Sequence, residues 1–152
     1  MSQTIVDEVL GEFVLDDLWV SQIHCDPLDS SLIIQIKTEG ETPDESQLAA
    51  ARELYTSLDR LTPQFMSRLY AYYSSIPESE KKRLRFPDIA FPPIESEGEV
   101  WKVFTEPGIF VSETSDSEGV VIEWLVNWAA NDTYAFAVLN GEIVKEEYVS
   151  RD

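Results

Sequence analysis

Hydrophobic and polar residues alternate along short runs at both ends of the chain. Before residue 40, three runs rich in β-branched and aromatic residues are separated by turn-forming Asp and Pro: GEFVLDD, LWVSQIHC and SLIIQIKT. After residue 99, five more runs follow: VWKVFT, GIFVSE, GVVIEWLVNWA, TYAFAVL and EIVKEEYV. Alternation with a period of two residues is typical of strands that bury one face. The sequence therefore predicts three antiparallel strands before residue 40 and five strands after residue 99.

The region between the two groups of strands has a helical pattern. Thr42 is a suitable N-cap, Pro43 suits the first helical position, and Glu45 follows the cap by three residues. The apolar residues that follow share one stripe of a helix: Leu48, Ala51, Leu54, Tyr55, Leu58 and Leu61. This pattern predicts a helix near residues 43–60 with one buried face.

A second helix is predicted directly after the first. Thr62-Pro63 repeats the signal of a cap followed by proline, and Pro77 ends the helical stretch. We therefore expect a helix near residues 63–76. Because strands and helices do not alternate strictly, the predicted fold class is α+β, an antiparallel sheet with both helices packed on one face.

The stretch from residue 120 to residue 149 predicts a sheet with an aromatic core. Asn140-Gly141 favours a type I′ hairpin, because these residues tolerate positive φ. The expected register pairs Val138 with Ile143, Phe136 with Lys145 and Tyr134 with Glu147. We expect four aromatic side chains in the core or at its rim, namely Trp124, Trp128, Tyr134 and Phe136. A platform on which a ligand stacks is the alternative interpretation of these rings.

Length and composition indicate one domain, residues 1–152. Of these residues, 43% are hydrophobic, which is enough to form a core. The sequence contains no apolar run of about 18 to 20 residues and no basic, then apolar, amino-terminal signal, so we expect a cytoplasmic protein. The single cysteine, Cys25, fits a reducing compartment because it has no partner for an internal disulfide.

Charge is the strongest compositional signal. The chain has 11 basic and 29 acidic residues, a formal net charge of −18. Residues 1–60 and residues 91–152 each carry 3 basic and 13 acidic side chains, which gives −10 for each flank, whereas residues 61–90 are at +2. Such a field repels nucleic acid and anionic membranes and attracts basic proteins. The alternative is that the charge serves only solubility.

The residue types that carry catalytic or metal chemistry lack the necessary arrangement. His24 and Cys25 are adjacent on a predicted strand, so their side chains point to opposite faces and cannot form a nucleophilic dyad. A zinc-type site would need further Cys or His ligands. Neither Asp16-Asp17 nor the loop at residues 113–119 follows the spacing of a calcium loop. We therefore expect no catalytic residue, no metal site, no cofactor and no enzyme activity.

One basic run interrupts the acidic chain, at Lys81, Lys82, Arg83 and Arg85. A single short patch on a protein of this charge is a poor footprint for nucleic acid. We expect it to lie against the acidic flanks or to face solvent.

Three features of the chain resemble a known family. They are an early Gly-Glu-Phe strand from Gly11 to Phe13, a Tyr-Tyr pair at Tyr72-Tyr73, and a late Trp, acidic residue and Asn-Gly hairpin formed by Trp128, Asp132 and Asn140-Gly141. The family consists of bacterial proteins known as a domain of unknown function and sometimes found among predicted toxin-immunity genes. Its members often have an acidic-His-Gly step after the tryptophan, where this chain has Asp132-Thr133-Tyr134-Ala135, so any role of that His or Gly does not carry over. The resemblance implies an α+β fold and allows an immunity role.

These observations predict a non-enzymatic acidic protein that inhibits a basic protein partner, such as a secreted toxin, by covering its active surface. The expected contact residues are three carboxylates of the last hairpin and two aromatic anchors: Glu142, Glu146, Glu147, Tyr148 and Trp19. The alternative is a ligand-binding or housekeeping module with an aromatic pocket between the sheet and the helices, and an enzyme that uses carboxylates is the third hypothesis. The sequence leaves the oligomeric state open.

Overall fold

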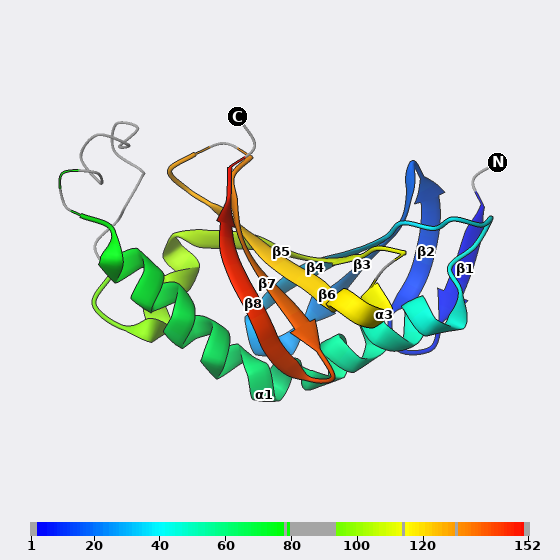
Figure 1. Ribbon diagram of the computed structural model, residues 1–152, viewed down its shortest axis with the longest axis horizontal. Helices are drawn as coiled ribbons and strands as arrows, with labels where there is room; N and C mark the ends of the chain where they lie inside the picture. Colours follow the sequence, from blue (N-terminus) through cyan, green and yellow to red (C-terminus); the bar gives the residue numbers. More distant parts are fainter. Residues whose placement is uncertain (1–2, 78, 80–93, 114, 130, 151–152) are drawn as a thin grey trace.

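A computed structural model describes residues 3–77, 79, 94–113, 115–129 and 131–150. Eight strands form one sheet in which neighbours in space are also neighbours in sequence (Figure 1). The strands are β1 (Thr4–Asp7), β2 (Gly11–Asp16), β3 (Leu18–Cys25), β4 (Ser30–Ile36), β5 (Phe104–Val111), β6 (Val120–Val126), β7 (Thr133–Leu139) and β8 (Glu142–Val149). One long helix, α1 (Glu45–Ser75), and one helical turn, α3 (Ser115–Glu118), accompany them, with two 3-10 segments, η1 (Asp26–Leu28) and η2 (Glu97–Lys102). The predicted α+β class is confirmed.

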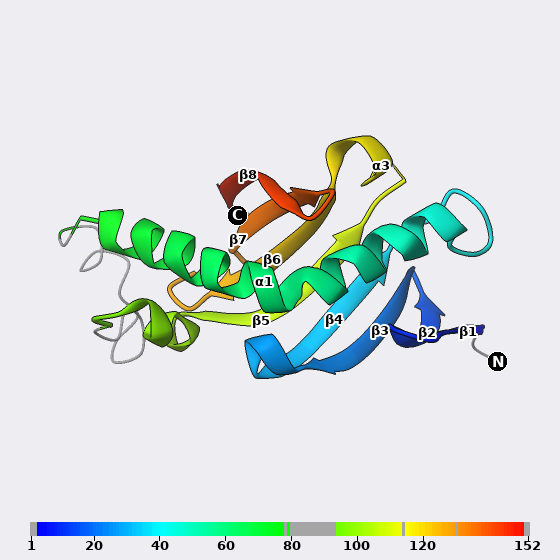
Figure 2. The same ribbon diagram turned by 90° about the horizontal axis from the view of Figure 1, so that it is seen from below.

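The sheet is antiparallel except at its centre. Six of the seven neighbouring pairs are antiparallel, and only β4 and β5 run parallel. A parallel pair needs a long crossover between its strands, and α1 lies within the segment that connects β4 to β5. Figure 2 shows α1 lying across the strands on one side of the sheet.

The predicted pair of helices is one continuous helix. Pro63 lies inside α1, and the helix bends near its middle (Figure 1). A proline in a helix interior costs about 3 kcal/mol because it removes one backbone donor. The sheet-facing stripe nevertheless continues past it through Leu61, Phe65 and Leu69, all with no exposed surface. Fully burying such a side chain contributes about 1.5–3 kcal/mol, so packing on both sides of Pro63 outweighs the lost hydrogen bond.

The first turn of α1 is capped by Asp44 rather than by Thr42. The Gln47 amide donates to Asp44 Oδ1 at 2.9 Å, and the Asp44 amide donates to Gln47 Oε1 at 3.2 Å. This reciprocal pair is a capping box. Gln47 Nε2 also donates to the Lys37 carbonyl at 2.7 Å, so the start of the helix is attached to the end of β4.

Strand prediction succeeded where alternation was long and failed where it was short. The three strands predicted before residue 40 and the last three after residue 119 are confirmed as β2–β4 and β6–β8. The four-residue edge strand β1 was missed because TIVD is too short to show a period. The runs predicted as two strands around Pro107 form η2 followed by the single strand β5, which has an irregular register between Thr105 and Gly108.

The core lies between α1 and the sheet. The four aromatic side chains predicted for it, Trp124, Trp128, Tyr134 and Phe136, are all buried. The Phe65 ring of α1 contacts them, with its centroid 5.3 Å from that of Trp124 and 4.9 Å from that of Phe136. The interpretation of these rings as core is confirmed.

The last hairpin forms at the predicted turn but in a shifted register. Asn140 and Gly141 have positive φ of 54° and 76°, as a type I′ turn requires. Val138 pairs with Ile143 as predicted, but Phe136 pairs with Glu146 and Tyr134 with Tyr148, so the predicted partners Lys145 and Glu147 are wrong. The register shifts between Ala137 and Val138, and a bulge there adds one residue on β8 and moves every later pair by one position.

Candidate functional site

The face of the sheet opposite α1 is open. On β6, buried residues alternate with half-buried ones, so Val121, Glu123 and Leu125 point away from the helix. The other helical segments that the structure describes, η1, η2 and α3, all contact α1, and α3 contributes only Glu118 to the border of the open face. Within the described residues, therefore, one face of the sheet is packed and the other is left to solvent (Figure 1).

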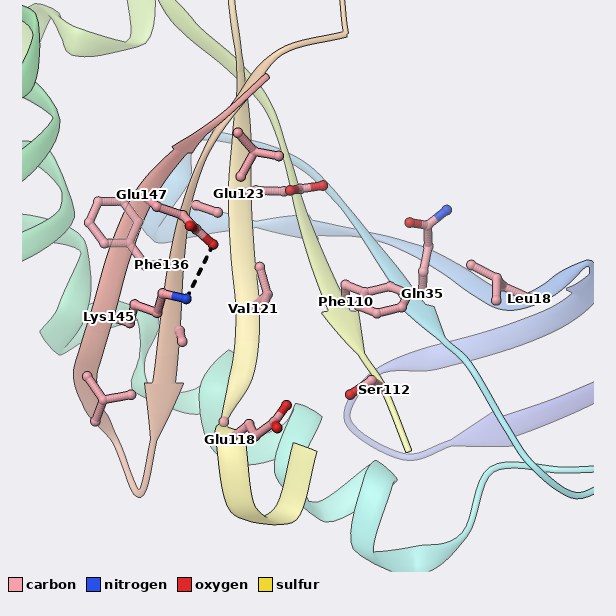
Figure 3. A pocket seen from close by; sticks show the side chains of 15 residues that line it. Leu18, Gln35, Phe110, Ser112, Glu118, Val121, Glu123, Phe136, Lys145 and Glu147 are labelled. Atoms are coloured by element: carbon pink, nitrogen blue, oxygen red, sulfur yellow. Dashed lines mark ion pairs between the residues drawn. The ribbon is translucent and has the colours of Figure 1, made fainter. Parts of the chain in front are cut away.

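A groove of about 900 Å³ hollows this open face, and we call it the open-face groove (Figure 3). Six neighbouring strands, β3 to β8, contribute to it. Its apolar side chains include Leu18, Phe110, Val121, Ala135, Ala137, Val144 and Val149. Its polar side chains are Gln35, Ser112, Glu118, Glu123, Lys145 and Glu147. A contiguous apolar surface rimmed by polar groups is typical of an interaction site.

The open-face groove is acidic. Its lining carries three carboxylates and one ammonium, a formal charge of −2. Glu118 and Glu123 lie on opposite sides of a line drawn across the strands from β3 to β8, and Glu147 lies toward the β8 end of that line, across from Gln35 (Figure 3). Lys145 Nζ is 3.7 Å from Glu147 Oε1, and Glu123 Oε2 accepts a hydrogen bond from Thr133 Oγ1 at 3.1 Å. The groove thus offers carboxylates held at fixed places around an apolar floor.

Gly119 places Glu118 at one side of the groove. Its φ is +92°, and a Cβ atom would lie 2.8 Å from the Val138 carbonyl oxygen. Only glycine fits that conformation and that space. The close approach brings the turn that carries Glu118 against β7.

The three glutamates predicted as one contact surface lie in three different environments. Glu147 lines the open-face groove. Glu146 faces α1, where it accepts hydrogen bonds from Arg68 Nη1 at 2.5 Å and from the Tyr134 hydroxyl at 2.7 Å. Glu142 is exposed beside the hairpin turn, outside the groove lining. Alternation along β8 and its bulge separate Glu146 from Glu147, so the structure does not bring the three together.

The predicted aromatic anchors are not free either. Trp19 is only 1% exposed and belongs to the core, so its prediction as an exposed anchor is wrong. It occupies an inward position of β3, between Leu15 of β2 and Ile36 of β4. Tyr148 is half-buried, and its ring stacks on Tyr72 and Trp128 at 5.8 and 6.2 Å between centroids.

Two hydrogen-bonded pairs of a tyrosine and a carboxylate connect β7, β8 and the turn before β7. The Tyr148 hydroxyl donates to Asp132 Oδ2 at 2.6 Å. The bond from the Tyr134 hydroxyl to Glu146 is of the same kind. Burial, and then the carboxylate partner, raises the pKa of both phenols well above the ordinary value of 10.0. Both hydroxyls therefore stay protonated donors, and the cluster joins β7 and β8 to α1 through Arg68.

The residues considered for catalysis or metal binding are also placed. Cys25 is buried, which raises the pKa of its thiol, whereas His24 is exposed and lies 3.0 Å from Asp26. They point to opposite faces of β3, as predicted. Among the residues that the structure describes, no three His, Cys, Asp or Glu side chains are grouped to hold a metal ion. The run Lys81 to Arg85 lies outside the described residues.

No helix in the described part of the chain has the length and apolar character needed to cross a bilayer.

Sequence reasoning missed most of the open-face groove. Its signal was present in GVVIEWLVNWA, where the second face of the strand, Val121, Glu123 and Leu125, is itself mostly apolar. A solvated face of an antiparallel strand is normally polar. Two apolar faces on one strand were therefore the sign of a second contact surface.

Comparisons with known proteins give one match. No curated protein and no solved structure matches the chain. A family model described as Domain of unknown function (DUF6985) matches residues 9–149, which extend from the turn after β1 to the last residue of β8 and so include the open-face groove. The chain therefore belongs to the DUF6985 family.

Proposed function

We propose that this protein is a non-enzymatic acidic binding protein that recognises a basic protein partner through the open-face groove. One observation carries the proposal: three carboxylates surround an apolar floor on the sheet face opposite α1. Val144 in this groove is 54% exposed. Apolar surface of this kind contributes affinity when it is buried by a partner.

The charges and the apolar floor have separate tasks in this proposal. A net charge of −18 attracts a basic partner from a distance and raises the association rate. Charges at an interface steer the encounter and fix orientation more than they add affinity. Phe110, Val121 and Val144 supply the surface that keeps the partner bound.

An immunity-type inhibitor that covers the active surface of a toxin is one form of this function. The acidic field and the broad sheet face support it, because an inhibitor of this kind needs a large surface of opposite charge. A bacterial, cytoplasmic setting is part of the same proposal. An immunity role predicts that cells producing the toxic partner grow again when they also produce this chain.

A ligand-binding or housekeeping module with an aromatic pocket is the alternative. It has less support, because the rings between the sheet and α1 pack on one another, with Phe65 in contact with Trp124 and Phe136.

Two glutamates on β8 give a matched test. Glu147 lines the groove and Glu142 does not, and both are exposed. Proteins captured from the source cell at low salt are identified, and binding of the purified partner is measured at salt concentrations of about 50 to 500 mM, which shorten the Debye length from roughly 14 to 4 Å. We expect a basic partner whose association rate falls with salt, and a loss of affinity of about tenfold or more for Glu147→Lys.

Glu142→Lys changes the net charge of the protein equally and serves as the control. Equal losses for both variants would mean that overall charge, not the groove, determines binding. A captured partner that is neutral or acidic, or an association rate that salt leaves unchanged, would contradict the proposed function.

A further inference from the structure

We infer that the segment of the partner that enters the open-face groove is an amphipathic α-helix with an apolar stripe flanked by Lys or Arg. This inference rests on the proposed function and specifies what that site recognises. It follows from the backbone of the sheet, the dimensions of the groove and the position of its charges.

The backbone of the sheet favours a helix over an extended segment. Five of the six strands that line the groove, β3 to β7, pair with neighbours on both sides, so their backbone groups are already used in the ladder, and only β8, at the rim, is an edge strand. An extended segment laid over this face would lose water from its own N–H and C=O groups and find no backbone partners. A helix satisfies these groups internally. The floor of the groove therefore offers contacts to side chains only. A helix can make these contacts without leaving its own N–H and C=O groups unpaired, because they are hydrogen-bonded within the helix.

The dimensions of the groove suit a helix of moderate length. Its lining reaches across six neighbouring strands, from Leu18 of β3 to Val149 of β8. At about 4.8 Å between strands this is on the order of 24 Å. A helix rises about 1.5 Å per residue, so about 16 residues cross it. On the opposite face α1 crosses the same sheet in this way (Figure 2).

The side chains of the groove define the sequence of the helix. Phe110 and Val121 lie between Glu118 and Glu123, which flank the line from β3 to β8 on its two sides, and Glu147 lies near the β8 end of that line (Figure 3). An apolar stripe placed on the floor brings the flanking residues of a helix next to these carboxylates. Lys or Arg at those flanks complements the formal charge of −2. A second copy of this chain does not suit the groove, because each copy carries −18.

Two synthetic peptides of about 16 residues test the inference. Both contain the same numbers of Leu, Lys and Ala. In one peptide Leu recurs at the helical spacing i, i+3, i+4, i+7, and in the other Leu alternates with polar residues. We expect calorimetry to give at least tenfold tighter binding for the helical pattern, and circular dichroism to show a gain of helix on binding. Equal affinity for the two peptides, or no binding of the helical one, overturns the inference.

Matched valine variants locate the binding. Val144, in the groove, is 54% exposed and Val6, on β1 outside the groove, is 76% exposed, so lysine fits at both positions without disturbing the core. We expect Val144→Lys to weaken the helical peptide at least fivefold and Val6→Lys to leave it within twofold. Equal losses place the peptide elsewhere and overturn the inference. If neither peptide binds but the partner protein still binds Glu147→Lys more weakly than Glu142→Lys, the inference of a helix is wrong and the proposed function stands. If the partner binds these two variants equally, the proposed function is wrong as well.

Discussion

At the scale of single residues, Trp124 is the centre of the aromatic core. It is 1% exposed and contacts Phe65, Trp101 and Phe136 with centroids 5.3, 5.6 and 5.9 Å away. Trp124→Ala leaves a large cavity, and we expect the free energy of unfolding to fall by about 3–5 kcal/mol. Urea denaturation measures this loss. A loss below about 1 kcal/mol would show that the ring is not part of the packed core.

Asp7 is a buried carboxylate whose charge stabilises the fold. Its side chain is 4% exposed and accepts hydrogen bonds from Arg52 at 2.8 and 2.6 Å and from the Val9 and Leu10 amides. These bonds, with the Arg52 guanidinium first, hold the pKa of Asp7 below its usual 3.8. The ion pair attaches the turn after β1 to α1.

The pH dependence follows from the direction of that shift. A depressed folded-state pKa gives stability that is present above pH 3.8, the unfolded value, and is lost as pH falls through the folded value. We expect Asp7→Asn to cost about 1–3 kcal/mol at pH 7, because Arg52 and two amides lose a charged acceptor. Urea denaturation at a series of pH values should show that the free energy of unfolding falls less on acidification for the variant than for the parent. Parallel curves for parent and variant would contradict this role of Asp7.

At the scale of elements, the start of α1 is the point most open to test. Asp44 closes the capping box, and the Ser46 hydroxyl and the Gln47 amide that bond to it lower its pKa. Asp44→Ala should reduce the free energy of unfolding by about 1 kcal/mol. Glu53→Ala, at an exposed position further along α1, is the control. If the two variants lose equal stability in thermal denaturation, the cap makes no special contribution.

The elements also show how far a sequence pattern reaches. Period-two runs located β6, β7 and β8, and the Asn140-Gly141 turn was identified because its positive φ restricts it to few residues. Two helices were predicted in place of one because Pro63 is a local signal for a helix start, and a local signal does not include the tertiary packing of Phe65 and Leu69. The bulge at Ala137 and Val138 has no local signal, yet it decides which β8 side chains enter the groove.

At the scale of the whole molecule, the sequence shows a net negative charge but not which carboxylates gather around one groove. Glu147 lies 24 residues after Glu123 in the sequence. It lines the same groove as Glu118 and Glu123 because β6 and β8 flank β7 and because Gly119 brings its turn close to β7. The groove requires residues of six strands. Its far wall, with Gln35 and Phe110, depends on the parallel pairing of β4 with β5, which strand patterns do not show.

The most direct test of the open-face groove as the binding surface is a titration of the protein with its basic partner, followed by methyl NMR. Methyl groups of Val121, Ala137 and Val144 report on the groove, and those of Ala49 and Ala71 report on the outer surface of α1. We expect shifts and broadening at the three groove positions, with Ala49 and Ala71 unchanged. Shifts at Ala49 and Ala71 while the groove methyls stay in place would contradict binding at the open-face groove.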